Sequence, residues 1–368
     1  MTSNVDAAMA TRSLKPGPSM RARRLALPAV LLMITAALPV SAQQDRKITQ
    51  LAEGVYAIEH EPNGNTTVII GDRQVLVVDT CFLPSDARRD IAQIRKWTDK
   101  PVTFVVNTHF HNDHNLGNRI YMDAFPALTI IAHKETKQDM DRFGPGSLMR
   151  EERSKSRLLG MQRTGKGPDG KDLSDDDKKQ ISQALQQQDS VIAELRGLTF
   201  QSATLSFDHD FTIDLGNREV QIKYLGRGNT TGDAVVYLPK EKIVITGDLV
   251  VNPIPYFYDG YPVEWAQTLQ NLATLDAAVY VSGHGPILHD KTHILLIHDL
   301  IQSAVDQMNE KLGQTGPALS RTLDDVKDGV DLSPFRERFA GSDKDLAAVF
   351  DDEATHLVKL VFTEASLR

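Results

Sequence analysis

The sequence NTHFHNDH at residues 107–114 decides the fold, because it places three histidines and an aspartate at the spacing of a metal site. In an extended chain, side chains two residues apart point the same way, so His109 and His111 can bind one metal ion. Asp113 and His114 follow after the chain turns, and they can face a second ion. Imidazole and carboxylate groups suit zinc, and also iron or manganese.

The segments around this motif predict an α/β fold. Residues 85–97 and 264–275 have helical patterns, and the strands gather in two halves, residues 48–135 and 203–286. Short β-branched runs bounded by Gly, Asp, Asn or Pro predict strands. These runs are 66–70, 74–78, 102–107, 128–132, 220–225, 234–238, 242–246 and 279–282.

Three more polar positions follow predicted strands. Asp248 comes just after the strand 242–246, where a carboxylate could bridge two metal ions. His284 ends the strand 279–282, and Asn229 lies in a glycine-rich turn after the strand that ends at residue 225. All these loops leave strand ends, so one edge of the sheets could collect them.

The motif at residues 107–114, followed by the turn 226–233, Asp248 and His284 in that order, resembles the metallo-β-lactamase superfamily. The resemblance runs from about residue 48 to about residue 286, and Asp79 also matches a family position near the metals. It implies a four-layer αββα sandwich with a two-metal site at one edge of the two sheets.

The resemblance also implies a set of ligands for two zinc ions. One ion is expected on His109, His111 and residue 229, the other on Asp113, His114 and His284, with Asp248 bridging them. The family usually has His at position 229, whereas this chain has Asn. Because an amide oxygen is a neutral and weaker zinc ligand than imidazole, the His109/His111 site is expected to bind its ion less tightly or to use water. Asn229 could instead only hold the turn through hydrogen bonds.

A bridged zinc pair predicts a hydrolase, since it lowers the pKa of bound water and supplies hydroxide at neutral pH. That hydroxide would attack an ester, thioester, lactone or lactam carbonyl, and Asp113 or Asp248 could pass the proton to the leaving group. β-Lactamases of the superfamily usually carry Cys or Ser at the position of Asp248, and an Asp there resembles the thioesterase and lactonase branches. A β-lactamase proper is therefore one alternative. A non-catalytic metal- or ligand-binding protein on the same fold is another.

Aromatic residues just after Asp248 predict a substrate-binding wall. Tyr256, Tyr258 and Tyr261 lie within a few residues of one another, and such side chains could line an apolar pocket. The alternative is that the aromatic group packs between sheet and helix, which is favoured for Trp265.

Residues 1–42 predict a secretory signal peptide with cleavage after Ala42. A basic region precedes the apolar run 25–40, which is too short and proline-interrupted for a spanning helix, so no stable membrane anchor is expected. The leader carries five basic residues and one acid, so the net charge falls from −8 for the chain to −12 for the exported, periplasmic or secreted, protein. That charge argues against nucleic acid and favours a small-molecule substrate.

Three segments make up the predicted domain organisation. The metallo-β-lactamase-like domain covers residues 43–290, and a charged, glutamine-rich helical insertion occupies residues 136–200 within it. Residues 291–368 form a helical C-terminal extension. The insertion could cover the site as a lid, or serve as a peripheral or dimer-forming element, which leaves a homo-oligomer open.

Overall fold

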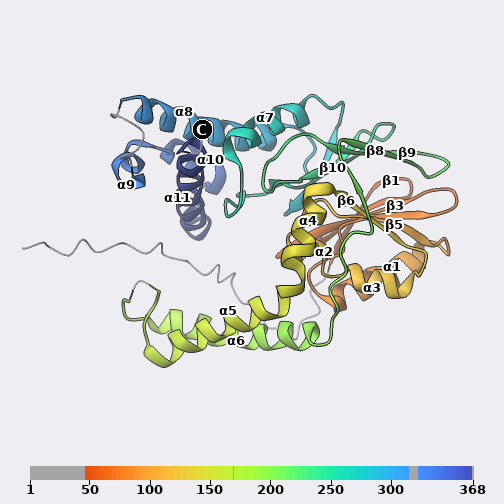
Figure 1. Ribbon diagram of the computed structural model, residues 1–368, viewed down its shortest axis with the longest axis horizontal. Coiled ribbons are helices and arrows are strands. Elements are labelled where there is room, and N and C mark those ends of the chain that lie inside the picture. The colour runs from red at the N-terminus through yellow and green to blue at the C-terminus, as the bar shows by residue number, and fades with distance from the viewer. Residues whose placement is uncertain (1–45, 169, 315–321, 367–368) are drawn as a thin grey trace, which may run out of the picture.

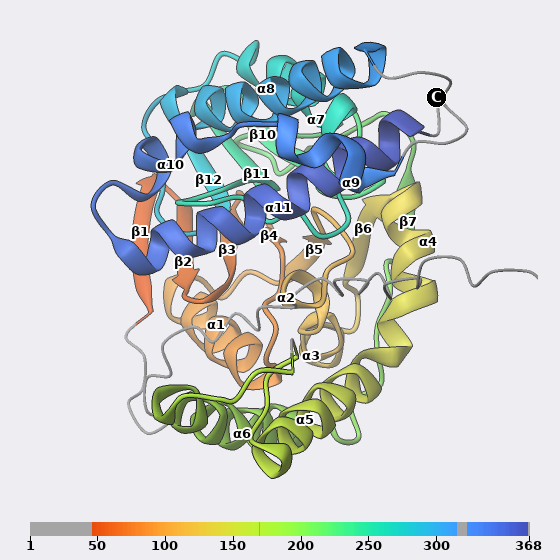
Figure 2. The same cartoon turned by 90° about the vertical axis from the view of Figure 1, so that its left-hand side faces the viewer.

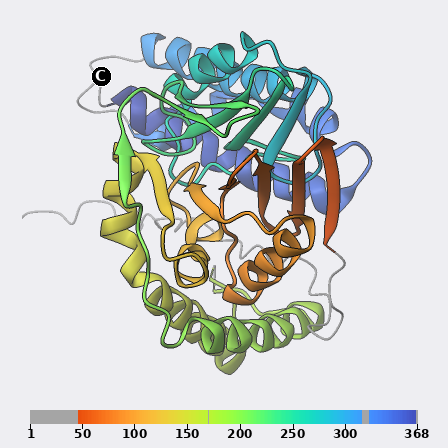
Figure 3. The ribbon, with the colours of Figure 1, turned by 90° about the vertical axis from the view of Figure 1, so that its right-hand side faces the viewer.

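Two β-sheets lie face to face between layers of helices (Figure 3). The computed structural model describes residues 46–168, 170–314 and 322–366 (Figure 1), so the predicted leader lies outside the described residues. The four-layer αββα sandwich implied by the resemblance is confirmed. No helix in the described part of the chain is long and apolar enough to cross a membrane.

The first sheet has seven strands in chain order. Its first four strands form an antiparallel meander, and β4 to β7 run parallel. The strands are β1 (Lys47–Ala52), β2 (Val55–His60), β3 (Asn63–Ile70), β4 (Val75–Val78), β5 (Val102–Val106), β6 (Thr129–His133) and β7 (Leu205–Phe207).

The second sheet has five strands in the order β12-β11-β10-β9-β8. Only β11 and β12 are parallel, and helix α7 (Pro262–Ala273) connects them. The strands are β8 (Asp210–Asp214), β9 (Glu219–Tyr224), β10 (Ala234–Leu238), β11 (Ile243–Val251) and β12 (Val279–His284). The strand predicted over 242–246 is too short, because β11 continues to Val251 with an irregular register around Gly247, whose φ is 52°.

Helices cover the outer faces of both sheets. Helix α1 (Pro84–Trp97) packs on the first sheet, α7 and α8 (Thr292–Gln314) pack on the second, and α11 (Lys344–Ser366) packs against α7 and α8. The remaining helices are α2 (Asn112–Asn115), α3 (Asn118–Ala124), α4 (Lys134–Phe143), α5 (Ser147–Thr164), α6 (Asp175–Leu195), α9 (Leu323–Val326) and α10 (Ser333–Ala340), with 3₁₀ turns at Gly144–Gly146 and Lys327–Gly329.

The core between the sheets follows from the β-branched strands. Val78 and Val106 of the first sheet pack in one fully buried cluster with Val236 and Val281 of the second. Burying such a side chain contributes about 1.5–3 kcal/mol, so this interface fixes how the strand ends of the two sheets face each other.

Helices α4, α5 and α6 occupy most of the segment predicted as an insertion. Helices α5 and α6 form a hairpin with its own small core of Leu158, Ile181 and Leu185. The carboxylate of Glu194 ties the hairpin to the start of α1, where it accepts hydrogen bonds from the backbone N–H and hydroxyl of Ser85. In the view of Figure 2, α2 lies between this hairpin and α11.

Candidate metal centre

Both sheets contribute loops to one cluster of polar side chains. The chain leaves β5, presents His109 and His111, and turns into α2, which carries Asp113 and His114. The second sheet supplies Asp248 from β11, His284 from the end of β12, and Asn229 from the loop between β9 and β10. The sequence-predicted ligands thus come together at one edge of the sandwich.

The side chains of His109, His111 and Asn229, termed the His109 group, form one half of the cluster. His109 Nε2 lies 3.1 Å from His111 Nδ1, and the Asn229 amide nitrogen lies 3.4 Å from the same Nδ1. The second ring nitrogen of His111 lies 3.3 Å from Asp259 Oδ2, a contact that the sequence did not suggest.

The side chains of Asp113, His114 and His284, termed the His284 group, form the other half. His284 Nε2 lies 2.9 Å from Asp113 Oδ2 and 3.2 Å from His114 Nε2. His114 is fully buried, and the side chain of His284 is 8% exposed. Three ligand atoms therefore converge where two buried histidines meet Asp113, whose side chain is 30% exposed.

Asp248 lies between the two groups. Its Oδ2 is 3.6 Å from both His109 Nε2 and His284 Nε2, and its Oδ1 is 3.2 Å from His114 Nε2. Oδ1 is buried and takes part in no hydrogen bond within the described part of the chain. A buried carboxylate oxygen left in this state is costly unless a cation satisfies it.

These residues fit a pair of metal ions. In each group two imidazole nitrogens face each other at 3.1 or 3.2 Å, which requires a proton or a metal ion between them. Two sets of ligand atoms lie close enough for one ion each: His109, His111 and Asp248, and Asp113, His114 and His284. The donors are nitrogen and oxygen, the set that suits zinc, iron or manganese.

Burial and nearby charges give the histidines of the cluster different pKa values. Burial lowers the pKa of His109 well below its usual value. Burial also opposes the charged form of His284, but Asp248 and Asp113 outweigh it and raise the pKa of His284 to about 10. The histidines in turn hold the pKa values of Asp113 and Asp248 well below the usual range, despite the burial of both carboxylates.

Outer contacts orient the ligands. Asp79 Oδ2 lies 2.9 Å from His114 Nδ1, and the same carboxylate accepts hydrogen bonds from the backbone N–H and hydroxyl of Thr108. His284 Nδ1 lies 2.9 Å from the carbonyl oxygen of Pro62. Each histidine of this half therefore has its far nitrogen engaged, which leaves Nε2 aimed at the centre. Asp79 was visible in the sequence, whereas Thr108 and Pro62 were not.

Glycine is required where β3 passes His114. A Cβ atom on Gly64 would lie 2.5 Å from the His114 ring, closer than real contacts allow. Asn65, next in β3, donates hydrogen bonds to the carbonyl oxygens of Ser282 and Gly285 on either side of His284. Strand β3 therefore holds both histidines of the His284 group in place.

The turn that presents Asn229 is held by a buried carboxylate. Asp233 accepts hydrogen bonds from the backbone N–H groups of Gly228 and Thr230, and burial raises the pKa of Asp233 to about 6. Asn229 is itself buried beside His111. Its side chain faces His111, while the hydrogen bonds that hold the turn come from Asp233 and Thr230.

The three predicted substrate-binding tyrosines differ in their surroundings. The ring of Tyr256 lies edge-on to His284, with ring centroids 5.4 Å apart, and Tyr258 lies 6.3 Å from Tyr256 with 49% of its surface exposed. The ring of Tyr261 instead lies under Arg227. Trp265 is fully buried in the core, as expected.

Comparisons with known proteins identify the family of the chain. The family model described as the metallo-beta-lactamase superfamily matches residues 61–284. The chain therefore belongs to the metallo-β-lactamase superfamily, whose members are mostly hydrolases.

Two curated relatives match parts of the chain. A linear primary-alkylsulfatase from Pseudomonas sp. (strain ATCC 19151) is 24% identical over 275 residues, which are 71% of this chain and 48% of that protein. A metallo-beta-lactamase type 2 from Elizabethkingia meningoseptica is 28% identical over 105 residues, which are 27% of this chain and 42% of that protein. The chain thus spans less than half the length of these two relatives.

Solved structures of metallo-β-lactamases also resemble the chain. TMB-1 is 18% identical with a TM-score of 0.49, and the match covers 70% of this chain and 98% of that one. A metallo-beta-lactamase from Pontibacter korlensis is 17% identical with a TM-score of 0.48, covering 70% and 99%.

Proposed function

We propose that the protein is a zinc-dependent hydrolase that cleaves a carbonyl substrate such as an ester, thioester, lactone or lactam. The observation that carries this proposal is the place of Asp248, whose two oxygens face the His109 group and the His284 group at once. A carboxylate placed between two ligand sets can hold two metal ions close together, and such a pair is the arrangement that activates water in two-metal hydrolases.

Two zinc ions, held by the two groups and by Asp248, would activate water and polarise the bond to be broken. The chain itself handles the proton. Asp113 is 30% exposed at its side chain, so one of its oxygens can reach the substrate while Oδ2 stays near His284. We assign to Asp113, or to Asp248, the transfer of a proton to the leaving group.

The charge around the centre favours an uncharged reacting group. Asp259 is 59% exposed at its side chain beside His111, and Asp113 lies at the opening as well. Carboxylates at these places repel an anionic ester, while Tyr256 and Tyr258 offer aromatic surface beside His284. A sulfate ester is a second candidate, since one relative is a linear primary-alkylsulfatase. A β-lactamase proper is a third, since another relative carries that name.

A panel of chromogenic lactam, lactone, thioester, carboxylic ester, phosphoester and sulfate ester substrates tests the function. We expect turnover on a carbonyl substrate that a chelator abolishes and zinc restores. Sulfate ester turnover without carbonyl turnover would favour the second candidate. Bound metal with no turnover on any substrate would instead identify a binding protein.

We further propose that the protein is exported and acts on small molecules rather than nucleic acid, without a stable membrane anchor. The basic and apolar pattern of residues 1–42 and the net charge of −12 after Ala42 support this. N-terminal sequencing of the protein from a periplasmic extract checks it, with a mature chain beginning at Gln43 as the expected result.

A further inference from the structure

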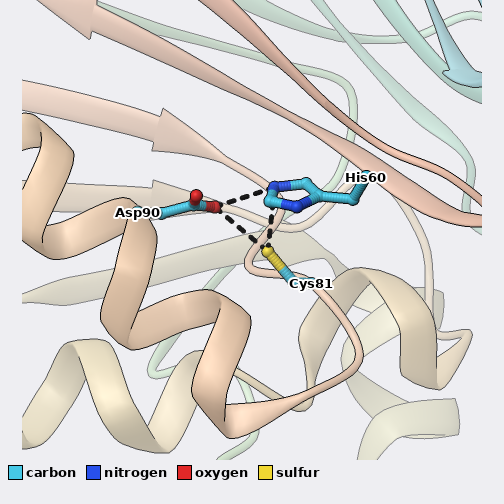
Figure 4. Close-up of side chains that lie close together, drawn as sticks. All are labelled: His60, Cys81 and Asp90. Atoms are coloured by element: carbon cyan, nitrogen blue, oxygen red, sulfur yellow. Dashed lines mark hydrogen bonds and ion pairs between the residues drawn. The ribbon is translucent and has the colours of Figure 1, made fainter. Parts of the chain in front are cut away.

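A second group of metal-ligating side chains lies in the first sheet, separate from the proposed zinc centre. His60 ends β2, Cys81 follows β4, and Asp90 lies on α1, and their side chains point toward one another (Figure 4). His60 Nε2 lies 2.9 Å from Asp90 Oδ2 and 3.3 Å from Cys81 Sγ, and Sγ lies 3.1 Å from Asp90 Oδ2. None of the three belongs to the His109 group or the His284 group.

The cluster is closed to solvent. Cys81 and Asp90 are fully buried and His60 is 5% exposed. Arg46 pairs with the other oxygen of Asp90, and its side chain is 17% exposed, so this positive charge stays close to water. Asp90 Oδ1 is therefore committed to Arg46, while Oδ2 faces the nitrogen and the sulfur.

The backbone at Cys81 adopts an unfavourable conformation to place this thiol. Its φ of 70° lies in the left-handed region, which costs a non-glycine residue about 1–2 kcal/mol. Strain of this kind persists only where the surroundings fix it, and it is concentrated at functional positions. Here it directs Sγ between His60 and Asp90.

We propose that His60, Cys81 and Asp90 form a separate site for one zinc ion. Zinc–ligand bond lengths place neighbouring ligand atoms of a tetrahedral site about 3.3–3.6 Å apart. The observed separations of 2.9–3.3 Å need to open by only a few tenths of an ångström. Thiolate, imidazole and carboxylate are all common zinc ligands, and the first and last bring two negative charges to a divalent ion.

A further oxygen donor lies beside the cluster. The hydroxyl of Tyr121 is fully buried and has no hydrogen-bond partner among the residues that the structure describes. Burial raises the pKa of Tyr121, and the charges of Asp90 and Cys81 add to this effect. The Thr66 hydroxyl lies 3.3 Å from Cys81 Sγ. The Thr66 hydroxyl, or a water bound to it, would complete four ligands.

The site differs from the proposed zinc centre in its sulfur ligand, and this makes it measurable. Cys81 is the only cysteine in the sequence, while the other centre has only nitrogen and oxygen donors. In a cobalt-substituted protein, a thiolate-to-cobalt charge-transfer band in the near ultraviolet can therefore arise only at Cys81. Because the cluster is buried, the full chain should be produced in minimal medium with cobalt, so that the ion is present during folding.

We expect the wild-type protein to show this band, and elemental analysis to find one cobalt ion per chain more than in Cys81→Ser. The Cys81→Ser protein should lose the band and keep the visible bands of the other centre. Asp248→Asn serves as the matched control, since it removes a ligand of the other centre and should leave the thiolate band in place.

The proposal is overturned if wild-type protein that contains cobalt lacks the thiolate band. In that case the three side chains form a hydrogen-bonded core in which the thiol donates to Asp90. The decisive measurement uses the wild-type chain, so it stands even where Cys81→Ser fails to fold. Substrate turnover plays no part in it, so the result is independent of the proposed function.

Discussion

The two halves of the metal centre present different ligands for the same task. The His284 group contains its own carboxylate, and both of its histidines are buried and held at their far nitrogens by Asp79 and by the carbonyl oxygen of Pro62. The His109 group has a neutral amide in place of a third strong ligand, and His111 is 25% exposed at its side chain. The carboxylate of Asp113 and the buried support from Asp79 therefore favour the His284 group, which we expect to bind its metal ion first and more tightly.

The largest effect is expected where the two halves share a ligand. Asp248→Asn removes the negative charge that faces both groups, so both ions should be lost. Changing a residue that only orients a metal ligand lowers metal affinity or activity about 10–100-fold. Changing a ligand shared by both ions should cost more, so we expect kcat/KM to fall about 10³-fold or more. Elemental analysis and turnover measure this together. A variant that keeps two ions and wild-type turnover would remove Asp248 from the centre.

Removing one histidine from each half in turn should show which half binds zinc more tightly. His284→Ala should abolish the tighter phase of a zinc titration of metal-free protein, because its ring contacts Asp113 and His114 at once. His111→Ala should abolish only the weaker phase. Circular dichroism controls for folding in both. The reverse pattern would show that the His109 group is the stronger half.

Weakening the outer support of one half is expected to have an intermediate effect. Asp79→Asn changes the acceptor for His114 Nδ1, and metal affinity of the His284 group should fall about 10–100-fold. The weaker phase of the same titration should move much less. Equal losses in both phases would mean that Asp79 supports the loop as a whole rather than His114.

A stronger ligand in the His109 group should reduce the difference in zinc affinity between the two halves. Asn229→His supplies an imidazole beside His111, and affinity at the His109 group should rise, by about 10-fold if the ring reaches the ion. Asn229→Ala is the matched control, because it removes the amide without offering a ligand. An unchanged zinc content in Asn229→His would favour a role for Asn229 in the turn alone.

A smaller effect is expected in the metal-free protein as the pH changes. The pKa of His284 is raised from 6.5 to about 10, so its protonated form stabilises the fold fully below pH 6.5, and this contribution is lost as the pH rises toward 10. The Tm of chelator-treated protein should fall over this range relative to His284→Gln. A parallel change in both proteins would assign the effect to other groups.

The sequence predicted most of the buried strands and most of the ligand loops, because β-branched runs that end in polar residues carry local signals. It did not predict β1, β2, β7 or β8. β1 is largely exposed, β7 has only three residues, and β8 is mostly exposed with an aspartate at each end, so their pairing depends on neighbouring strands rather than on composition. β2 is buried, and its short run was missed. The contact between Asp259 and His111 joins residues far apart in sequence, and no motif signals it.

The cluster of His60, Cys81 and Asp90 shows the same limit. Residues of this kind with no shared spacing predict surface or packed positions, and His60 is expected at one of these. The three side chains come together only in the folded protein, where the end of β2, the segment after β4 and helix α1 meet. The metal centre could be predicted because one loop carries four of its ligands in a recognisable motif, whereas each element of this cluster carries a single ligand and no motif.

The division of ligands between the sheets has a mechanical consequence. The first sheet carries the loop with His109 and Asp113, and the second carries Asp248 and His284. If only one sheet has folded, only part of the ligand set is in place. Tight metal binding should therefore begin only when both sheets have folded and packed together. Metal ions bound by residues of both sheets would cross-link the two sheets, so separating the sheets by force should require more force with metal than without it.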